Sequence, residues 1–159
     1  MKRSVLMFGL VLAAAILAGC ATPEKRAAIA TSTQCNGLAS VTVSGITVSP
    51  PSIDLDPDPV CINFSSGSAQ IRWTFAQGGF AFPDDAITWS ATPSYRGTVL
   101  QQGQAYQVVI DPTGLSQWKY TIKVRSNTNP PRTWTCDPTI VNRDTLILAR
   151  TTISCTTAP

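Results

Sequence analysis

The sequence predicts an all-β fold, an antiparallel β-sandwich that follows a flexible N-terminal tether. From position 41 onward, short runs of residues alternate between apolar and polar types, which is the period of a half-buried strand. Clusters of Gly, Pro, Asp, Asn and Ser separate these runs, as turns do. No window carries apolar residues at the i, i+3, i+4 spacing of a long helix. Many short strands joined by turns are typical of sandwiches and barrels.

The first half of the domain contains four predicted strands, at 41–48, 60–64, 71–75 and 87–89. Gly45 breaks the alternation of the first strand as a β-bulge does, and the two prolines Pro50 and Pro51 end it. A Ser-Gly turn follows the second strand. The third strand carries its large apolar side chains on one face, so we expect that face to lie in the core.

The second half contains further predicted strands, at 106–110, 120–124, 139–141 and 146–153. The run 120–124 has the cleanest amphipathic alternation in the chain. Turn residues follow the first of these strands at 111–114 and the second at 127–131. We therefore expect eight or nine short strands in the domain as a whole.

An export signal occupies the first 20 residues. Lys2 and Arg3 form a basic start, and the 14 residues from Val5 to Ala18 carry no charge. Such a run is too short to cross a bilayer as a helix, which takes about 20 apolar residues, so it is predicted to be the core of a signal peptide.

The end of this run, Leu17-Ala18-Gly19-Cys20, resembles the lipobox of bacterial lipoproteins at all four positions. The resemblance implies that the thiol of Cys20 receives a diacylglycerol, that the chain is cut just before it, and that acyl chains such as palmitate then hold the protein on a membrane. Two buried acyl chains anchor a protein stably without a transmembrane helix. Position 21 is Ala rather than the Asp that retains enterobacterial relatives in the inner membrane, so the resemblance favours the outer membrane. The alternative is a plain signal peptide with an incidental cysteine.

Three segments follow from these observations: a lipoprotein signal peptide at 1–19, a lipidated tether at 20–34 and a β-sandwich domain at 35–159. The expected location is the bacterial cell envelope, with the domain facing the periplasm from the outer membrane. The sequence leaves open whether the domain faces the exterior instead.

Four cysteines remain after Cys20: Cys35, Cys61, Cys136 and Cys155. An even number in an exported chain indicates two disulfides, and four cysteines allow three pairings. We favour Cys35 with Cys155, which would join the two ends of the domain, and Cys61 with Cys136. The chain has no C-x-x-C pair, which disfavours a metal site built from the four thiolates.

Charge and composition narrow the function classes. The full chain has 12 basic and 9 acidic residues, and loss of Lys2 and Arg3 leaves 10 basic residues against 9 acidic ones. Near neutrality and the lack of a basic cluster argue against nucleic-acid binding. The chain has no histidine, which removes Ser-His-Asp and Cys-His catalysis and histidine metal sites. We therefore predict a protein that is not an enzyme and needs no cofactor.

Two acidic clusters are candidate sites. Asp54, Asp56 and Asp58 are spaced two residues apart and could hold a calcium ion in an extended loop, the alternative being a solvated loop that discourages edge pairing. Asp84 and Asp85 could form half of a hydrolytic carboxylate pair, although a loop after a Phe-Pro pair is the simpler interpretation.

Aromatic residues near turns are candidates for a partner-binding surface. Phe80 and Phe82 lie in a glycine-flanked loop, and Trp118 lies beside a turn. If exposed, these three would form an interface patch, because aromatic side chains anchor interfaces. The alternative is that the phenylalanines fold back and plug one end of the sandwich.

A second, looser resemblance concerns the fold. The run 120–124, a short turn and the run 137–141 look like the last hairpin of immunoglobulin-like or cupredoxin-like sandwiches, and 71–75 resembles their central Trp-bearing strand. Cupredoxin copper needs two histidines and this chain has none, so a cupredoxin-like domain here would be metal-free.

These observations favour a non-enzymatic lipoprotein on the outer membrane, whose domain presents loops and one sheet edge to another envelope component, either a protein or the cell wall. The alternative is an inhibitor or immunity lipoprotein that blocks a cell-wall hydrolase, with the loop 79–83 entering the enzyme's cleft.

Overall fold

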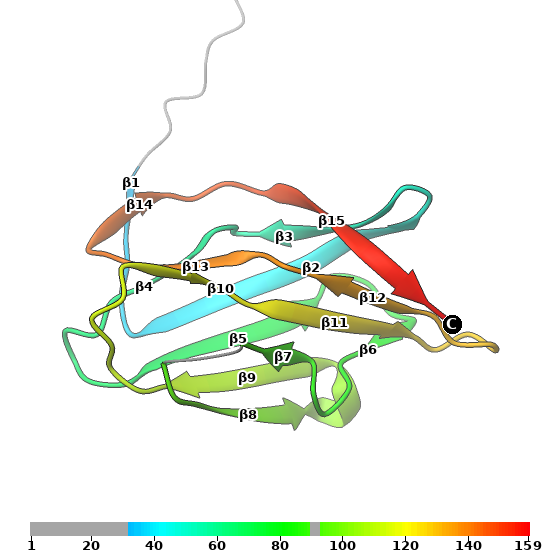
Figure 1. Ribbon diagram of the computed structural model, residues 1–159, viewed down its shortest axis with the longest axis horizontal. Coiled ribbons are helices and arrows are strands. Elements are labelled where there is room, and N and C mark those ends of the chain that lie inside the picture. The colour runs from blue at the N-terminus through cyan, green and yellow to red at the C-terminus, as the bar shows by residue number, and fades with distance from the viewer. Residues whose placement is uncertain (1–31, 90–92) are drawn as a thin grey trace, which may run out of the picture.

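The computed structural model describes residues 32–89 and 93–159 (Figure 1). The predicted all-β, sandwich-like fold is confirmed: this part of the chain contains fifteen strands and one short 3-10 turn, η1. Within it, no helix is long and apolar enough to cross a membrane. The signal peptide, Cys20 and residues 21–31 of the predicted tether lie outside the described residues.

The strands are short and follow one another closely along the chain. Their bounds are β1 Ser32–Gln34, β2 Leu38–Val48, β3 Pro51–Asp56, β4 Val60–Ile62, β5 Ala69–Phe75, β6 Phe80–Ala81, β7 Ile87–Thr88, β8 Tyr95–Leu100, β9 Ala105–Ile110, β10 Gln117–Lys119, β11 Thr121–Ser126, β12 Thr133–Cys136, β13 Thr139–Asn142, β14 Thr145–Ile147 and β15 Thr151–Ala158. The turn η1, Gln101–Gly103, joins β8 to β9.

One large sheet makes up most of the domain. Its strand order is β6-β11-β12-β15-β3-β2-β5-β9-β8, and β7 pairs with β11 beside β6. The sheet curls, so that β11 and β12 lie across from β5 and β9 (Figure 1). At one end its two margins meet, because the backbone N–H of Phe82 donates to the carbonyl of Gly103 in η1 at 2.8 Å. Two smaller sheets, β1-β14 and β10-β13-β4, complete the domain.

Most strand pairs are antiparallel, as predicted, but two are parallel. β2 runs parallel to β5, and β4 runs parallel to β13. Parallel neighbours need a crossover connection. Here β3 and β4 lie between β2 and β5 in the sequence, which gives the chain room to return.

The core fills the space inside the curled sheet. Ile71 and Trp73 of β5 and Ile122 and Val124 of β11 are fully buried, which confirms the faces predicted from alternation. The Nε1–H of Trp73 donates to the hydroxyl of Tyr120 at 3.1 Å, a buried hydrogen bond between the two sides of the core.

Several segments differ from the predicted arrangement. β2 ends at Val48 before the two prolines, as predicted, but Pro51 also opens an unpredicted strand, β3. The two strands form a tight hairpin in which the Thr47 hydroxyl donates to the carbonyl of Pro50 at 2.6 Å. The run 120–124 forms its hairpin with β12, and 139–142 pairs instead with β10 and β4. β1 pairs with β14, so the folded part includes residues 32–34, which we assigned to the tether.

The disulfide pairing differs from the predicted one. Cys35 is bonded to Cys61 and Cys136 to Cys155, with Cα separations of 5.4 and 4.4 Å. The predicted pairs, Cys35 with Cys155 and Cys61 with Cys136, are wrong because the strand order sets the neighbours. Cys136 and Cys155 are direct partners in the register of β12 and β15. Cys35 lies beside Cys61 because Asn36 bridges to Ile62.

Candidate functional site

The three aspartates proposed for calcium do not converge. The carboxylate of Asp54 accepts hydrogen bonds from the Thr152 hydroxyl and the Arg150 guanidinium. Asp58 is buried and accepts from the backbone N–H of Thr139 at 3.4 Å, whereas Asp56 is exposed. Within residues 32–89 and 93–159, no group of three His, Cys, Asp or Glu side chains is placed to hold a metal ion, so the structure does not bring these three carboxylates together.

These environments shift the pKa values of Asp54 and Asp58 in opposite directions. The Thr152 hydrogen bond, with help from Arg150, holds the pKa of Asp54 below its usual range although partial burial opposes it. Burial raises the pKa of Asp58, and the hydrogen bond from Thr139 only partly offsets this. Asp54 therefore links β3 to β15, and Asp58 links the segment after β3 to the start of β13.

The phenylalanines proposed as a partner surface pack into the molecule. The ring of Phe82 is buried and stacks on Phe75, with 4.2 Å between ring centroids. The ring of Phe80 meets Trp134 edge-on at 5.8 Å. The structure thus contradicts an exposed patch at Phe80 and Phe82 and bears out the alternative, in which the phenylalanines fold back and cover the end of the core.

Asp84 and Asp85 also have structural surroundings. The ammonium of Lys123 on β11 binds the carboxylate of Asp85. The backbone carbonyl of Asp84 accepts a hydrogen bond from the Tyr106 hydroxyl at 2.9 Å. This loop is therefore held to both sides of the curled sheet.

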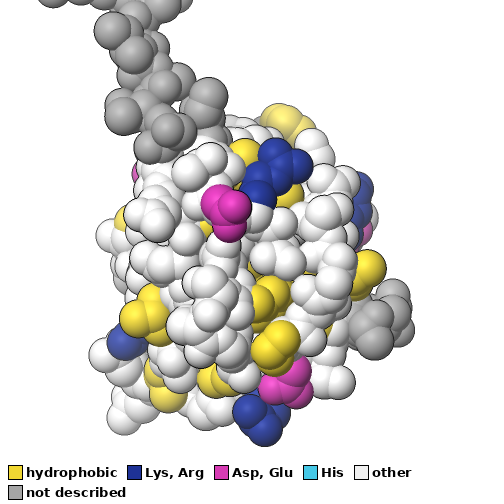
Figure 2. All heavy atoms as spheres, turned by 90° about the vertical axis from the view of Figure 1, so that its left-hand side faces the viewer, with side chains coloured by type: hydrophobic (Ala, Val, Ile, Leu, Met, Phe, Trp, Pro, Cys, Tyr) yellow, Lys and Arg dark blue, Asp and Glu magenta, His cyan; other side chains and the backbone are white. Residues whose placement is uncertain are grey.

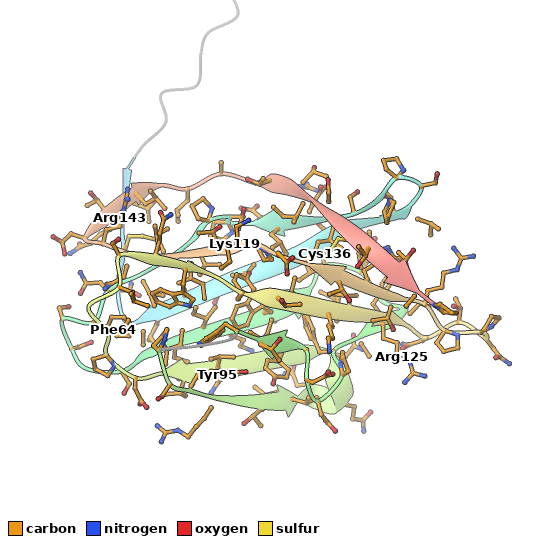
Figure 3. The ribbon with its side chains drawn as sticks, viewed as in Figure 1. Phe64, Tyr95, Lys119, Arg125, Cys136 and Arg143 are labelled. Atoms are coloured by element: carbon orange, nitrogen blue, oxygen red, sulfur yellow. A yellow bond between two sulfur atoms is a disulfide. The ribbon has the colours of Figure 1, made fainter. Side chains whose placement is uncertain are left out.

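Trp118 belongs to a cluster of three half-buried aromatic rings with Trp89 and Tyr95, which we call the aromatic trio. Trp89 lies 3.9 Å from Tyr95 and meets Trp118 edge-on at 6.4 Å, measured between ring centroids. The Nε1–H of Trp89 donates to the carbonyl of Pro93 at 2.7 Å. Trp118 is thus half-buried rather than freely exposed, and the trio fixes the start of β8 at Tyr95, the one member that Figure 3 labels.

β8 is the long free margin of the large sheet. β9 pairs with one side of β8, and no other described strand pairs with its outer side, at the lower margin of Figure 1. The strands at the other margin, β6 and β7, have only two residues each. The six residues of β8 therefore present the longest open row of backbone N–H and C=O groups at either margin of this sheet.

The usual protections of an edge strand are few in β8. Natural sheets block edges with prolines, charges or bulges. β8 contains no proline, and its register with β9 runs without a shift from Tyr95 opposite Ile110 to Leu100 opposite Ala105. Its single charged residue is Arg96. The guanidinium of Arg96 lies 3.8 Å from the carboxylate of Asp111, the residue that follows β9. The edge is therefore straight and accessible to another strand.

A glycine lets the inner face of β8 pack closely. A Cβ at Gly97 would lie 2.4 Å from the hydroxyl oxygen of Tyr106, so only glycine leaves room for that ring. The Tyr106 hydroxyl can then reach the carbonyl of Asp84, and burial raises the pKa of this tyrosine. β8 is thus fixed from its inner face while its backbone edge stays open.

The end of the molecule where β1 lies carries no strongly charged patch. Figure 2 shows this end: its few charged side chains are of both signs, and hydrophobic side chains lie between them. Among the described side chains on this face, basic residues do not gather.

Comparison of the chain with family models, with curated proteins and with solved structures gives no match. The sequence does not predict β8, because Gly97 interrupts the apolar alternation of this strand and the residue before it, Arg96, is charged. The one feature of the segment 95–100 that favours a strand is its content of Tyr, Thr, Val and Leu between two turn regions.

Proposed function

We propose that this protein is a lipid-anchored, non-enzymatic binding module of the bacterial cell envelope, which captures an extended segment of a partner protein on β8. The observation that carries the proposal is the open six-residue edge of β8. An extended peptide that adds to such an edge gains main-chain hydrogen bonds, while alternate side chains supply selectivity.

The energetics suit a moderate and reversible contact. Each net hydrogen bond contributes about 0.5–1.5 kcal/mol, so a few of them across one short strand yield modest affinity before side-chain contacts are added. The inner-face fixation of β8 through Tyr106 and the aromatic trio supports the proposal further, because an ordered edge costs less conformational entropy when a partner binds.

The anchor part of the proposal rests on the lipobox resemblance at Cys20. Residues 21–31 separate this cysteine from the folded part, and an extended chain spans at most about 3.3–3.6 Å per residue, or roughly 40 Å in all. That length would let β8 reach partners in the envelope while the acyl chains stay in the membrane. Ala21 favours the outer membrane as the site of anchorage.

Metabolic labelling tests the anchor. Cells given an alkyne analogue of palmitate should label the wild-type protein, and the Cys20→Ala variant should lose the label. A wild-type protein that carries no acyl label and is released into the medium would contradict the anchored module.

Photo-crosslinking in living cells tests the edge. A photoreactive amino acid at Thr98, exposed on β8, should give discrete adducts with an envelope protein. The matched control is the same amino acid at Thr42, which is exposed on β2 and is paired on one side with Asp56 of β3 and on the other with Thr74 of β5. Equal adduct yields at the two positions, or none at Thr98, would contradict strand addition.

A further inference from the structure

A groove on the outer face of the molecule lies at the junction of β7, β10 and β11. It has a volume of about 480 Å³ and is lined by Thr88, Trp89, Lys119, Tyr120, Thr121 and Asp137. Figure 3 labels Lys119 on the front layer of strands, where β10 leads into β11. The groove is separate from the backbone edge of β8, which faces away from β9 at the margin of the sheet.

A row of polar side chains crosses the floor of this groove. Thr88 and Thr121 are direct partners in the register of β7 and β11. The hydroxyl of Thr121 donates to Oδ1 of Asp137 at 2.9 Å, which leaves Oδ2 of this exposed carboxylate for another donor. Two hydroxyls and a carboxylate thus border the same groove, and they can donate to and accept from the hydroxyl groups of a sugar.

Trp89 supplies a fixed aromatic wall. Its Nε1–H donates a hydrogen bond to the carbonyl of Pro93. The ring of Tyr95 covers part of the indole, with 3.9 Å between the ring centroids. What remains of the indole surface borders the groove. An indole held in place by a hydrogen bond and a stacking partner needs no reordering to receive the C–H face of a pyranose ring.

Lys119 and Asp137 bring opposite charges to the same groove without pairing. Both are exposed, and within the described part of the chain neither forms an ion pair. The ammonium can therefore donate to ring or hydroxyl oxygens, and the carboxylate can accept from hydroxyls. Hydrogen bonds to charged groups are the stronger ones in such contacts.

We propose that this groove binds a saccharide, with a pyranose ring against Trp89 and its hydroxyl groups bonded to Asp137, Thr121 and Lys119. The mixture of one aromatic wall and several polar groups is typical of small-ligand sites that fix orientation through a few directed contacts. Because the groove is open, binding is weak for a single sugar and gains from neighbouring groups in a polymer such as a cell-wall glycan. This activity is additional to strand capture on β8.

Titration of the full-length protein in a sugar-free detergent tests the proposal. The probes are chitotriose and cellotriose, and binding is measured by calorimetry and by tryptophan fluorescence. We expect a saturable response to at least one trisaccharide, weakened at least tenfold by Asp137→Asn and by Trp89→Leu. Asp56→Asn, at an exposed carboxylate outside the groove, should bind as the wild type does.

The variants have a folding control and a separate functional control. Asp137→Asn alters an exposed side chain, so its thermal melting should match the wild type even if Trp89→Leu is destabilised. Asp137→Asn should not change crosslinking from Thr98, because Asp137 does not contact β8, and this separates failure of the saccharide site from failure of the β8 edge. Absence of a saturable response to both trisaccharides, binding that survives both substitutions, or binding only of the free stem peptide of the cell wall would each overturn the proposal.

Discussion

Strands β5 and β15 occupy comparable positions in the large sheet and are held there by different means. Each has a hydrogen-bonded neighbour on both sides. β5 buries Ala69, Ile71 and Trp73 completely, whereas β15 has only half-buried or exposed residues, with Ile153 and Cys155 turned toward the core. A position in the middle of a sheet therefore does not imply a position in the core.

The comparison separates two sources of stability. Burial of large apolar side chains contributes about 1.5–3 kcal/mol each relative to exposure, and β5 draws on this term. β15 depends on its ladders with β3 and β12 and on the disulfide from Cys155 to Cys136. Substitutions in these strands and in their partners test this division, from the largest expected effect to the smallest.

Replacement of Trp73 by alanine should destabilise the domain most. The change removes a fully buried indole and leaves the Tyr120 hydroxyl without its donor, so we expect a loss of about 3–5 kcal/mol in the free energy of unfolding. Urea denaturation measures it. Thr74→Ala, on the outer face of the same strand, should stay within about 0.5 kcal/mol. A loss below 1 kcal/mol for Trp73→Ala would show that burial does not hold β5.

Removal of the disulfide on β15 should cost slightly less. Cys136 and Cys155 are 19 residues apart, and the chain-entropy model gives about 3 kcal/mol for closing a loop of this length. The double variant Cys136→Ala, Cys155→Ala should also exchange the amide hydrogens of β15 faster, while those of β5 keep their protection. Unchanged exchange in β15 would mean that its ladders alone hold it.

Replacement of Tyr120 by phenylalanine isolates the hydrogen bond at the centre of the core. The ring is kept, but the Nε1–H of Trp73 loses its acceptor, and a buried donor without a partner costs about 1–3 kcal/mol. Thermal or urea unfolding measures the change. Tyr95→Phe, at a half-buried ring beside β8, is the matched control and should have a smaller effect. Equal effects of the two changes would argue against a special role for this bond.

The smallest effect concerns the outer face of β15, where Thr152 bonds to Asp54. The folded pKa of Asp54 is lowered, mainly by Thr152, so this contribution is complete above the unfolded value of about 3.9 and is lost as the pH falls through the folded value. Thr152→Ala should therefore cost no more than about 1 kcal/mol at pH 7 and less at acid pH. Melting temperatures at pH 7 and pH 3 measure the difference.

Asp58 provides a control for Asp54, because its pKa is shifted in the opposite direction. Burial raises its folded pKa, so its charged form weakens the fold at neutral pH, and the penalty fades as acid protonates the group. Asp58→Asn should raise the melting temperature at pH 7 and change it little at pH 3. The same pH response for Thr152→Ala and Asp58→Asn would contradict these assignments.

Alternation in the sequence predicted several of the strands that line the core, but not β3 or β12. Ile71, Trp73, Ile122 and Val124 were assigned to the correct face because the period of two records burial directly. β3 was missed because it begins with Pro51 and contains two aspartates. β12 was missed because its four residues follow a proline-rich turn too closely to show a period.

Features that depend on strand order could not be predicted in this way. The pairing of Cys136 with Cys155 follows from β12 lying next to β15 in the sheet. The open edge of β8 follows from its place at the end of the strand order, beside β9. The residues of a strand do not show which strands will be its neighbours. Phe80 and Phe82 were equally ambiguous, because glycine-flanked aromatic residues suit both an exposed loop and a cap on the core.

The pairing of β15 with β3 also has a consequence for biosynthesis. These strands come from opposite ends of the domain, at residues 51–56 and 151–158, so the sheet cannot close until the last segment has been synthesised. Long-range pairing of this kind slows folding and keeps the nascent chain open for longer. The bond from Cys155 to Cys136 is likewise among the last contacts that the chain can form.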